Sequence, residues 1–183
     1  MMKKINVAAE ASIKCSKGSF IICARTDANG VHGLDETIKR SKKYIDAGAS
    51  MIFPEGLKNP EEFRIVANEL KNYGSKEGPF LLANMTEFGK TTYITLEEYK
   101  KLGYHCVIYP VSTLRIAMRA VDMFLKDLRK TGTQKDFVKH MQTREELYGL
   151  LHYTPGEEWF YPNPHCKDIE FEDPHLENAN KKK

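Results

Sequence analysis

Charged and polar side chains follow four apolar segments of the chain, each at the point where its segment ends. In chain order they are Arg25 and Asp27, then Glu55, then Asn84, Thr86 and Glu87, and last Ser112 and Arg115. Ligands of parallel α/β proteins bind at the carboxyl ends of the strands, so we expect these side chains to meet in one ring. The guanidinium fork of arginine matches a carboxylate bidentately, and two arginines favour a substrate that carries several carboxylates.

The other members of this ring would either complete such a site or stabilise the sheet. Glu55 could accept a hydrogen bond from a substrate hydroxyl or position a metal-bound water, while Asn84 and Thr86 offer neutral donors. The structural alternative is an ion pair between Arg25 and Glu55 that ties adjacent strands together, because such pairs are common in proteins. The same behaviour at four consecutive segment ends favours a binding site.

The apolar segments predict the strands that position these residues. They are rich in Ile, Val, Leu and Phe without a two-residue alternation, which is typical of strands buried on both faces of a parallel sheet. The segments span 19–24, 50–54, 79–83 and 105–109. Helices are predicted before and between them, over 1–17, 33–48, 59–74 and 95–103. This alternation of strands and helices indicates a parallel α/β fold.

The rest of the chain sets the bounds of the domain. Two longer helices are predicted over about 112–131 and 134–152, and they complete a domain of residues 1–153. Residues 154–183 are rich in Pro, acidic residues and Lys, and we expect them to form a tail that frays at its end. Four strands cannot close a TIM barrel, which needs eight, and no glycine-rich phosphate loop follows the first strand. The fold is therefore either a small open sheet or half of a barrel.

Composition and charge exclude several classes of protein. The chain has 183 residues, of which 41% are apolar and 29% charged, and its formal net charge is +3. This is the balance of an ordered, soluble globular protein, and it does not suggest nucleic-acid binding. No stretch approaches the ~20 apolar residues of a membrane helix. The beginning of the chain has no secretory pattern, so we expect an intracellular, reducing setting.

The four cysteines and the histidines have no spacing that indicates a metal site. The cysteines are Cys15, Cys23, Cys106 and Cys166. Cys23 and Cys106 lie within predicted strands, where a free thiol behaves as a small buried hydrophobe. We therefore predict that both are buried.

Five motifs in the right order and spacing carry a family resemblance over roughly residues 1–153. They are "ARTDA", "AGASMIFPEG", "LLANMTEFGKT", "YPVSTLRIAMRA" and "GTQKDFVKHMQTREELY". Each motif is weak by itself, but the ordered set is specific. It resembles the isocitrate lyase / phosphoenolpyruvate mutase superfamily and, within it, most closely the 2-methylisocitrate lyase family.

The resemblance implies a fold and a set of site residues. The fold would be the C-terminal half of a (β/α)8 TIM barrel, with the four strands as its strands five to eight, followed by helices of the type that swap between subunits. The implied substrate-binding residues are Arg25, Glu55, Asn84, Met85, Thr86, Arg115 and Arg144. Taken by itself, Arg144 would be a solvated residue on the first turn of a helix, and only the resemblance assigns it a role.

The resemblance also implies a chemistry, which is the Mg²⁺-dependent cleavage of 2-methylisocitrate into pyruvate and succinate. The family's Ser-Gly substrate loop, its Asp-x-Asp magnesium motif and its Cys-Gly-His catalytic loop have no counterpart in this sequence. We therefore assign this chain no metal ligand and no catalytic residue. We expect a truncated lyase that is inactive alone. Family relatives place it in the cytoplasm or the mitochondrial matrix.

An open half-barrel would expose two sheet edges and apolar inner faces. We therefore expect a homo-oligomer or association with a full-length paralogue, and a small di- or tricarboxylate as the substrate. Two alternatives stay open. One is an enzyme of the phosphoenolpyruvate or carboxyphosphonoenolpyruvate mutase type. The other is a non-catalytic half-barrel that binds carboxylates or promotes oligomerisation.

Overall fold

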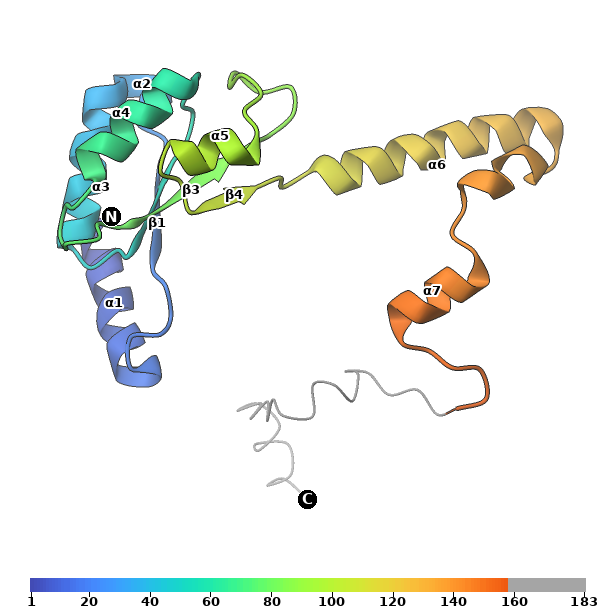
Figure 1. Cartoon of the computed structure of the whole chain (residues 1–183), viewed down its shortest axis with the longest axis horizontal. Helices are drawn as coiled ribbons and strands as arrows, with labels where there is room; N and C mark the ends of the chain where they lie inside the picture. Colours follow the sequence, from blue (N-terminus) through green and yellow to red (C-terminus); the bar gives the residue numbers. More distant parts are fainter. Residues whose placement is uncertain (158–183) are drawn as a thin grey trace. The chain divides into compact units, whose positions relative to one another are not determined.

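The computed structural model describes residues 1–157 and divides the chain into two compact units, Met1–Val121 and a second that begins at Asp122. The first unit is a parallel sheet covered by helices (Figure 1). Its elements are α1 (Met2–Ser16), β1 (Cys23–Thr26), α2 (Asn29–His32), α3 (Leu34–Asp46), β2 (Met51–Pro54), α4 (Pro60–Leu70), β3 (Phe80–Asn84), α5 (Leu96–Lys101), β4 (Cys106–Ile108) and the beginning of α6 (Ser112–Thr131).

The four strands pair in chain order, β1-β2-β3-β4, and every pair is parallel. Ala24 lies opposite Ile52, Ile52 opposite Leu81, and Ala83 opposite Val107. The predicted parallel α/β plan is confirmed. Because all strands run the same way, their carboxyl ends meet at one edge of the sheet.

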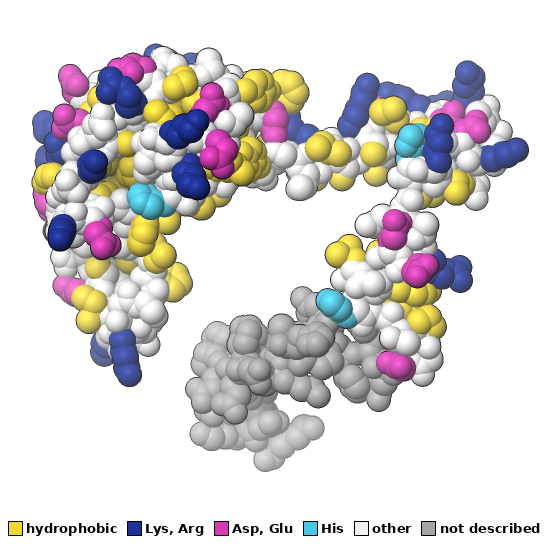
Figure 2. All heavy atoms as spheres, viewed as in Figure 1, with side chains coloured by type: hydrophobic (Ala, Val, Ile, Leu, Met, Phe, Trp, Pro, Cys, Tyr) yellow, Lys and Arg dark blue, Asp and Glu magenta, His cyan; other side chains and the backbone are white. Residues whose placement is uncertain are grey.

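One hydrophobic core lies between the helices and one face of the sheet. Ile52, Val66 and Leu70 are fully buried there, and α5 contributes the buried ring of Tyr99. Complete burial of one such aliphatic side chain contributes about 1.5–3 kcal/mol. Charged side chains of both signs are interspersed over the surface of this unit (Figure 2).

The opposite face of the sheet is less well covered in the described part of the chain, most clearly at β1. In β1, Ala24 and Thr26 are buried whereas Cys23 and Arg25 are exposed. The prediction of burial on both faces is therefore wrong for β1, as is that of a buried Cys23, whereas Ile52, Phe53 and Pro54 are buried in succession in β2. Alternate side chains of a strand point to opposite faces, and the helices pack on only one of them. Cys106 is half-buried.

Local contacts explain where the elements differ from the predicted ranges. The first strand begins at Cys23 rather than at residue 19, because α1 binds both backbone groups of Phe20. The Ser12 hydroxyl donates to the Phe20 carbonyl (2.8 Å), and the Phe20 amide donates to Ser16 Oγ (3.1 Å). The short helix α2 was not predicted at all.

The second unit contains the end of α6, a 3-10 helix (Lys135–His140) and α7 (Arg144–Leu151). A single helix over 134–152 was predicted, and this is wrong. Thr143 begins a new helix through a reciprocal capping box, in which its hydroxyl accepts from the Glu146 amide (3.1 Å) and its amide donates to the Glu146 carboxylate (2.7 Å). Such a cap stabilises a helix start and thereby separates two helices. Most of the predicted tail, 158–183, lies outside the described residues.

Candidate functional site

Arg25 and Asp27 form the first part of the site, at the carboxyl end of β1. Arg25 Nη2 donates to Asp27 Oδ1 (2.7 Å), and Arg25 Nε donates to Asp27 Oδ2 (3.1 Å). The guanidinium group also lies 5.0 Å from the centre of the Phe53 ring. The hydrogen bond from Arg25 lowers the pKa of the Asp27 carboxyl, and it raises the pKa of Arg25 in turn.

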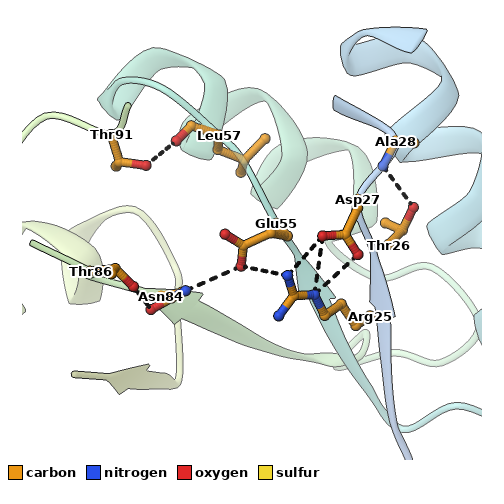
Figure 3. A network of polar contacts seen from close by, with 9 residues as sticks. All are labelled: Arg25, Thr26, Asp27, Ala28, Glu55, Leu57, Asn84, Thr86 and Thr91. Carbon is orange, nitrogen blue, oxygen red and sulfur yellow. Dashed lines mark hydrogen bonds and ion pairs between the residues drawn. The ribbon is translucent and has the colours of Figure 1, made fainter. Parts of the chain in front are cut away.

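A chain of polar contacts continues from Arg25 across the next two strands (Figure 3). Arg25 Nη2 lies 3.8 Å from Glu55 Oε2, after β2. Asn84 Nδ2, at the end of β3, donates to the same Glu55 oxygen (3.3 Å), and the Thr86 hydroxyl donates to Asn84 Oδ1 (2.6 Å). The structure thus brings together the predicted residues of three strand ends. The interstrand pair of Arg25 with Glu55 is present, but Asp27 is the closer partner.

Arg115 belongs to a second polar cluster of the same unit, between the segment after β3 and the first turn of α6. Glu87 accepts a hydrogen bond from the Ser112 hydroxyl, and its other oxygen lies 3.6 Å from Arg115 Nε. The bond from Ser112 lowers the pKa of Glu87. The guanidinium group of Arg115 lies 5.2 Å from the ring centre of Phe88, which is exposed. Arg115 is thus held by a carboxylate and an aromatic ring.

The two remaining predicted site residues are Met85 and Arg144. Met85 is buried in the core, where its sulfur accepts a hydrogen bond from the Tyr99 hydroxyl (3.7 Å). Its side chain points away from Asn84 and Thr86, because residues next to each other in an extended segment face opposite sides. Arg144 begins α7 in the second unit. Substrate contact by Met85 and by Arg144 stays a prediction.

Sequence reasoning missed the residues that hold the segment after Glu55. Asn29 of α2 donates from Nδ2 to the Gly56 carbonyl (2.8 Å) and to Glu62 Oε2 (2.9 Å). The same Glu62 oxygen accepts from the Lys58 amide (2.9 Å). The side chain of Asn29 is almost fully buried. The motif "DANG" indicates only a turn and does not reveal this clamp.

Within residues 1–157 no three His, Cys, Asp or Glu side chains gather in a way that could hold a metal ion. The donors around Glu55 are an arginine and an amide, which compete with a cation instead of binding it. The residues described here therefore do not fit Mg²⁺, the ion implied by the family resemblance. No helix of this part is long and apolar enough to cross a membrane.

The fold and the strand-end clusters define a parallel α/β protein whose candidate site lies at the strand ends where TIM barrels bind their substrates. The sequence model of the family described as "Phosphoenolpyruvate phosphomutase" matches residues 1–129. The chain belongs to this family, and the resemblance to the isocitrate lyase / phosphoenolpyruvate mutase superfamily is confirmed.

Individual relatives agree with this assignment. The chain is 48% identical over 135 residues to "Probable 2-methylisocitrate lyase 1" of Corynebacterium glutamicum, a match covering 74% of the chain and 42% of that protein. It is 44% identical over 153 residues to "2-methylisocitrate lyase" of Aeropyrum pernix, covering 84% of the chain and 46% of the relative. The crystal structure of 2,3-dimethylmalate lyase, a member of the same superfamily, superimposes with a TM-score of 0.71 at 30% identity, over 81% of this chain and 49% of the other. The chain spans about half the length of the curated relatives it matches.

Proposed function

We propose that this chain supplies the carboxylate-binding part of a site of the 2-methylisocitrate lyase type. The observation that carries the proposal is the contiguous polar chain from Arg25 through Glu55 to Asn84 and Thr86 at the carboxyl ends of adjacent strands. The similarity to curated 2-methylisocitrate lyases at 44% and 48% identity supports the choice of substrate. The reaction would be the cleavage of one carbon–carbon bond of 2-methylisocitrate to pyruvate and succinate.

The described side chains suit the binding and orientation of such a substrate. Arg25 and Arg115 would each bind a carboxylate group of this tricarboxylate. Asn84 and Thr86 would fix its orientation as neutral hydrogen-bonding groups. When the carbon–carbon bond breaks, the substrate hydroxyl loses its proton and becomes the keto oxygen of pyruvate, and Glu55 is placed to accept a hydrogen bond from that hydroxyl. The carbon that becomes part of succinate must gain a proton, and we assign no donor for it in this chain.

A phosphonopyruvate-type mutase is the second candidate, because the matching family model is described as a phosphomutase. A mutase substrate carries a carboxylate and a phosphonate or phosphate group, which the same two arginines could bind. The identity to the curated lyases favours a tricarboxylate. Turnover and binding of 2-methylisocitrate and of phosphonopyruvate, measured side by side, distinguish the two.

We also propose that a further polypeptide covers the apolar surfaces of this chain, either a second copy or a full-length paralogue. Leu114, Met118 and Val121 lie on one face of α6 and are 59%, 56% and 45% exposed, and contiguous exposed apolar side chains of this kind mark interaction surfaces. The mass of the purified chain in solution, alone and after co-expression with a full-length lyase, tests this. A stable monomer under both conditions would refute it.

The test of the site combines turnover and binding. Purified chain with Mg²⁺ and 2-methylisocitrate is expected to form no pyruvate above background, because the described residues provide no metal site and no assigned proton donor. Binding of succinate, followed by NMR, is expected to be weakened at least about tenfold by Arg25→Gln, since a charge-assisted bidentate contact is lost. The matched control is Arg64→Gln, which removes an exposed arginine paired with Glu61 on α4. Succinate binding that is equal in both variants would contradict the proposed site.

A further inference from the structure

Asp27 occupies one of the two edges through which the Arg25 guanidinium can bind a carboxylate bidentately. It accepts from both Nε and Nη2, at 3.1 and 2.7 Å (Figure 3). This side-by-side arrangement is the one in which a guanidinium group binds a substrate carboxylate. Nη2, the nitrogen that both bidentate edges of the guanidinium group share, also lies 3.8 Å from Glu55 Oε2. In the described structure a carboxylate ligand therefore meets an arginine that already has carboxylate partners.

The two protein carboxylates differ in how firmly they are held. The side chain of Glu55 is 26% exposed and accepts a further hydrogen bond from Asn84. The side chain of Asp27 is 64% exposed, and within residues 1–157 the hydrogen bonds to its carboxylate come from Arg25. The side chain of Asp27 can therefore rotate into the solvent with little loss of free energy, because water solvates a carboxylate well. Asp27 is the partner that a ligand can replace.

We propose that Asp27 is an internal competitor that holds the binding edge of Arg25 until a carboxylate ligand displaces it. The proposal rests on the proposed function of Arg25 as a carboxylate-binding group. An internal carboxylate has no association entropy to lose, whereas a free ligand loses translational and rotational freedom on binding. Asp27 therefore lowers the affinity of every carboxylate by the same factor. Ligands whose further carboxylates make additional contacts are the ones that still bind at low concentration.

This competition differs measurably from simple charge repulsion. If Asp27 only repelled anions, its removal would favour a dianion more than a monoanion, since the Coulomb energy scales with the charge of the ligand. If Asp27 competes for the same edge, its removal tightens both ligands equally. Succinate and acetate are suitable probes because they carry two carboxylates and one.

The experiment compares the whole chain with its Asp27→Asn and Glu61→Gln variants, titrated with succinate and with acetate at about physiological ionic strength. Glu61 is a matched control, since it pairs with Arg64 at similar exposure on α4 and its removal changes the net charge equally. Asp27→Asn is expected to tighten both ligands by a common factor of about two to five, the range of an exposed ion pair. Glu61→Gln is expected to change neither affinity.

A second measurement reports on the pair itself. The carboxyl carbon resonance of Asp27 in the unmodified chain is expected to shift when succinate saturates the site, because the aspartate then loses its guanidinium partner. Unchanged or weaker binding in Asp27→Asn would overturn the proposal and would instead make Asp27 a residue that orients Arg25. A gain that is much larger for succinate than for acetate would also overturn it. Succinate binding that is indifferent to Arg25→Gln would refute the proposed function itself, so the two failures are distinguishable.

Discussion

Replacement of Asn29 by alanine tests how the segment that carries Glu55 is held in place. The side-chain amide of Asn29 donates to the Gly56 carbonyl at 2.8 Å and to the Glu62 carboxylate at 2.9 Å, and the residue is only 8% exposed. A neutral hydrogen bond contributes about 1 kcal/mol and a bond to a charged group about 1.5–3 kcal/mol. Glu62 keeps its bond from the Lys58 amide, which limits the loss. We expect Asn29→Ala to lower the free energy of unfolding by about 2–3 kcal/mol.

Urea unfolding of the chain measures this change, and the sequence offers a matched control. Asn6 of α1 also donates from Nδ2 to a carboxylate, that of Glu10 at 2.6 Å, but this pair is exposed. Asn6→Ala should change the free energy of unfolding by less than about 0.5 kcal/mol, as is usual for surface substitutions. Amide exchange at Lys58 should also become faster in Asn29→Ala. Equal stability of the two variants would refute the view that Asn29 clamps the segment after Glu55.

Two further predictions concern the core and a helix start. Tyr104 is 6% exposed and its hydroxyl has no hydrogen-bond partner within the described residues, so Tyr104→Phe is expected to raise the free energy of unfolding by about 1 kcal/mol in thermal unfolding. Burial raises the pKa of the Tyr104 hydroxyl. Above about pH 10 the unfolded chain therefore releases the hydroxyl proton of Tyr104 while the folded chain keeps it, so the free energy of unfolding falls as the pH rises. This fall should be smaller in Tyr104→Phe. Thr95 caps α5 in a reciprocal box with Glu98, and Thr95→Ala should lower the free energy of unfolding by about 1 kcal/mol. A destabilised Tyr104→Phe, or a Thr95→Ala as stable as the parent chain, would contradict the respective argument.

The positions of the strand ends could be predicted from the sequence, whereas the pairing of their side chains could not. Apolar segments that end in polar residues are sufficient to place Arg25, Glu55 and Asn84 at one edge of a parallel sheet. The inward direction of Met85 follows from strand alternation and was available in principle. The preference of Arg25 for Asp27, at 2.7 Å, over Glu55, at 3.8 Å, depends on side-chain rotamers, which no residue pattern encodes.

The net charge of the candidate site residues determines whether an anionic ligand needs further positive charge in order to bind. The two guanidinium groups belong to Arg25 and Arg115, and the three carboxylates to Asp27, Glu55 and Glu87. At neutral pH two positive and three negative charges sum to one negative charge. Under the proposed function, a tricarboxylate would gain nothing from the summed charge of these five groups, and its binding would depend on directed contacts to each arginine. Displacement of Asp27 into water makes the field at Arg25 more favourable when the ligand arrives, because water between the freed carboxylate and the guanidinium weakens their Coulomb interaction. The arrangement of these groups thus favours ligands that replace the internal carboxylates. Additional positive charge from a bound cation or another polypeptide would strengthen the binding of such an anionic ligand without any change in these contacts.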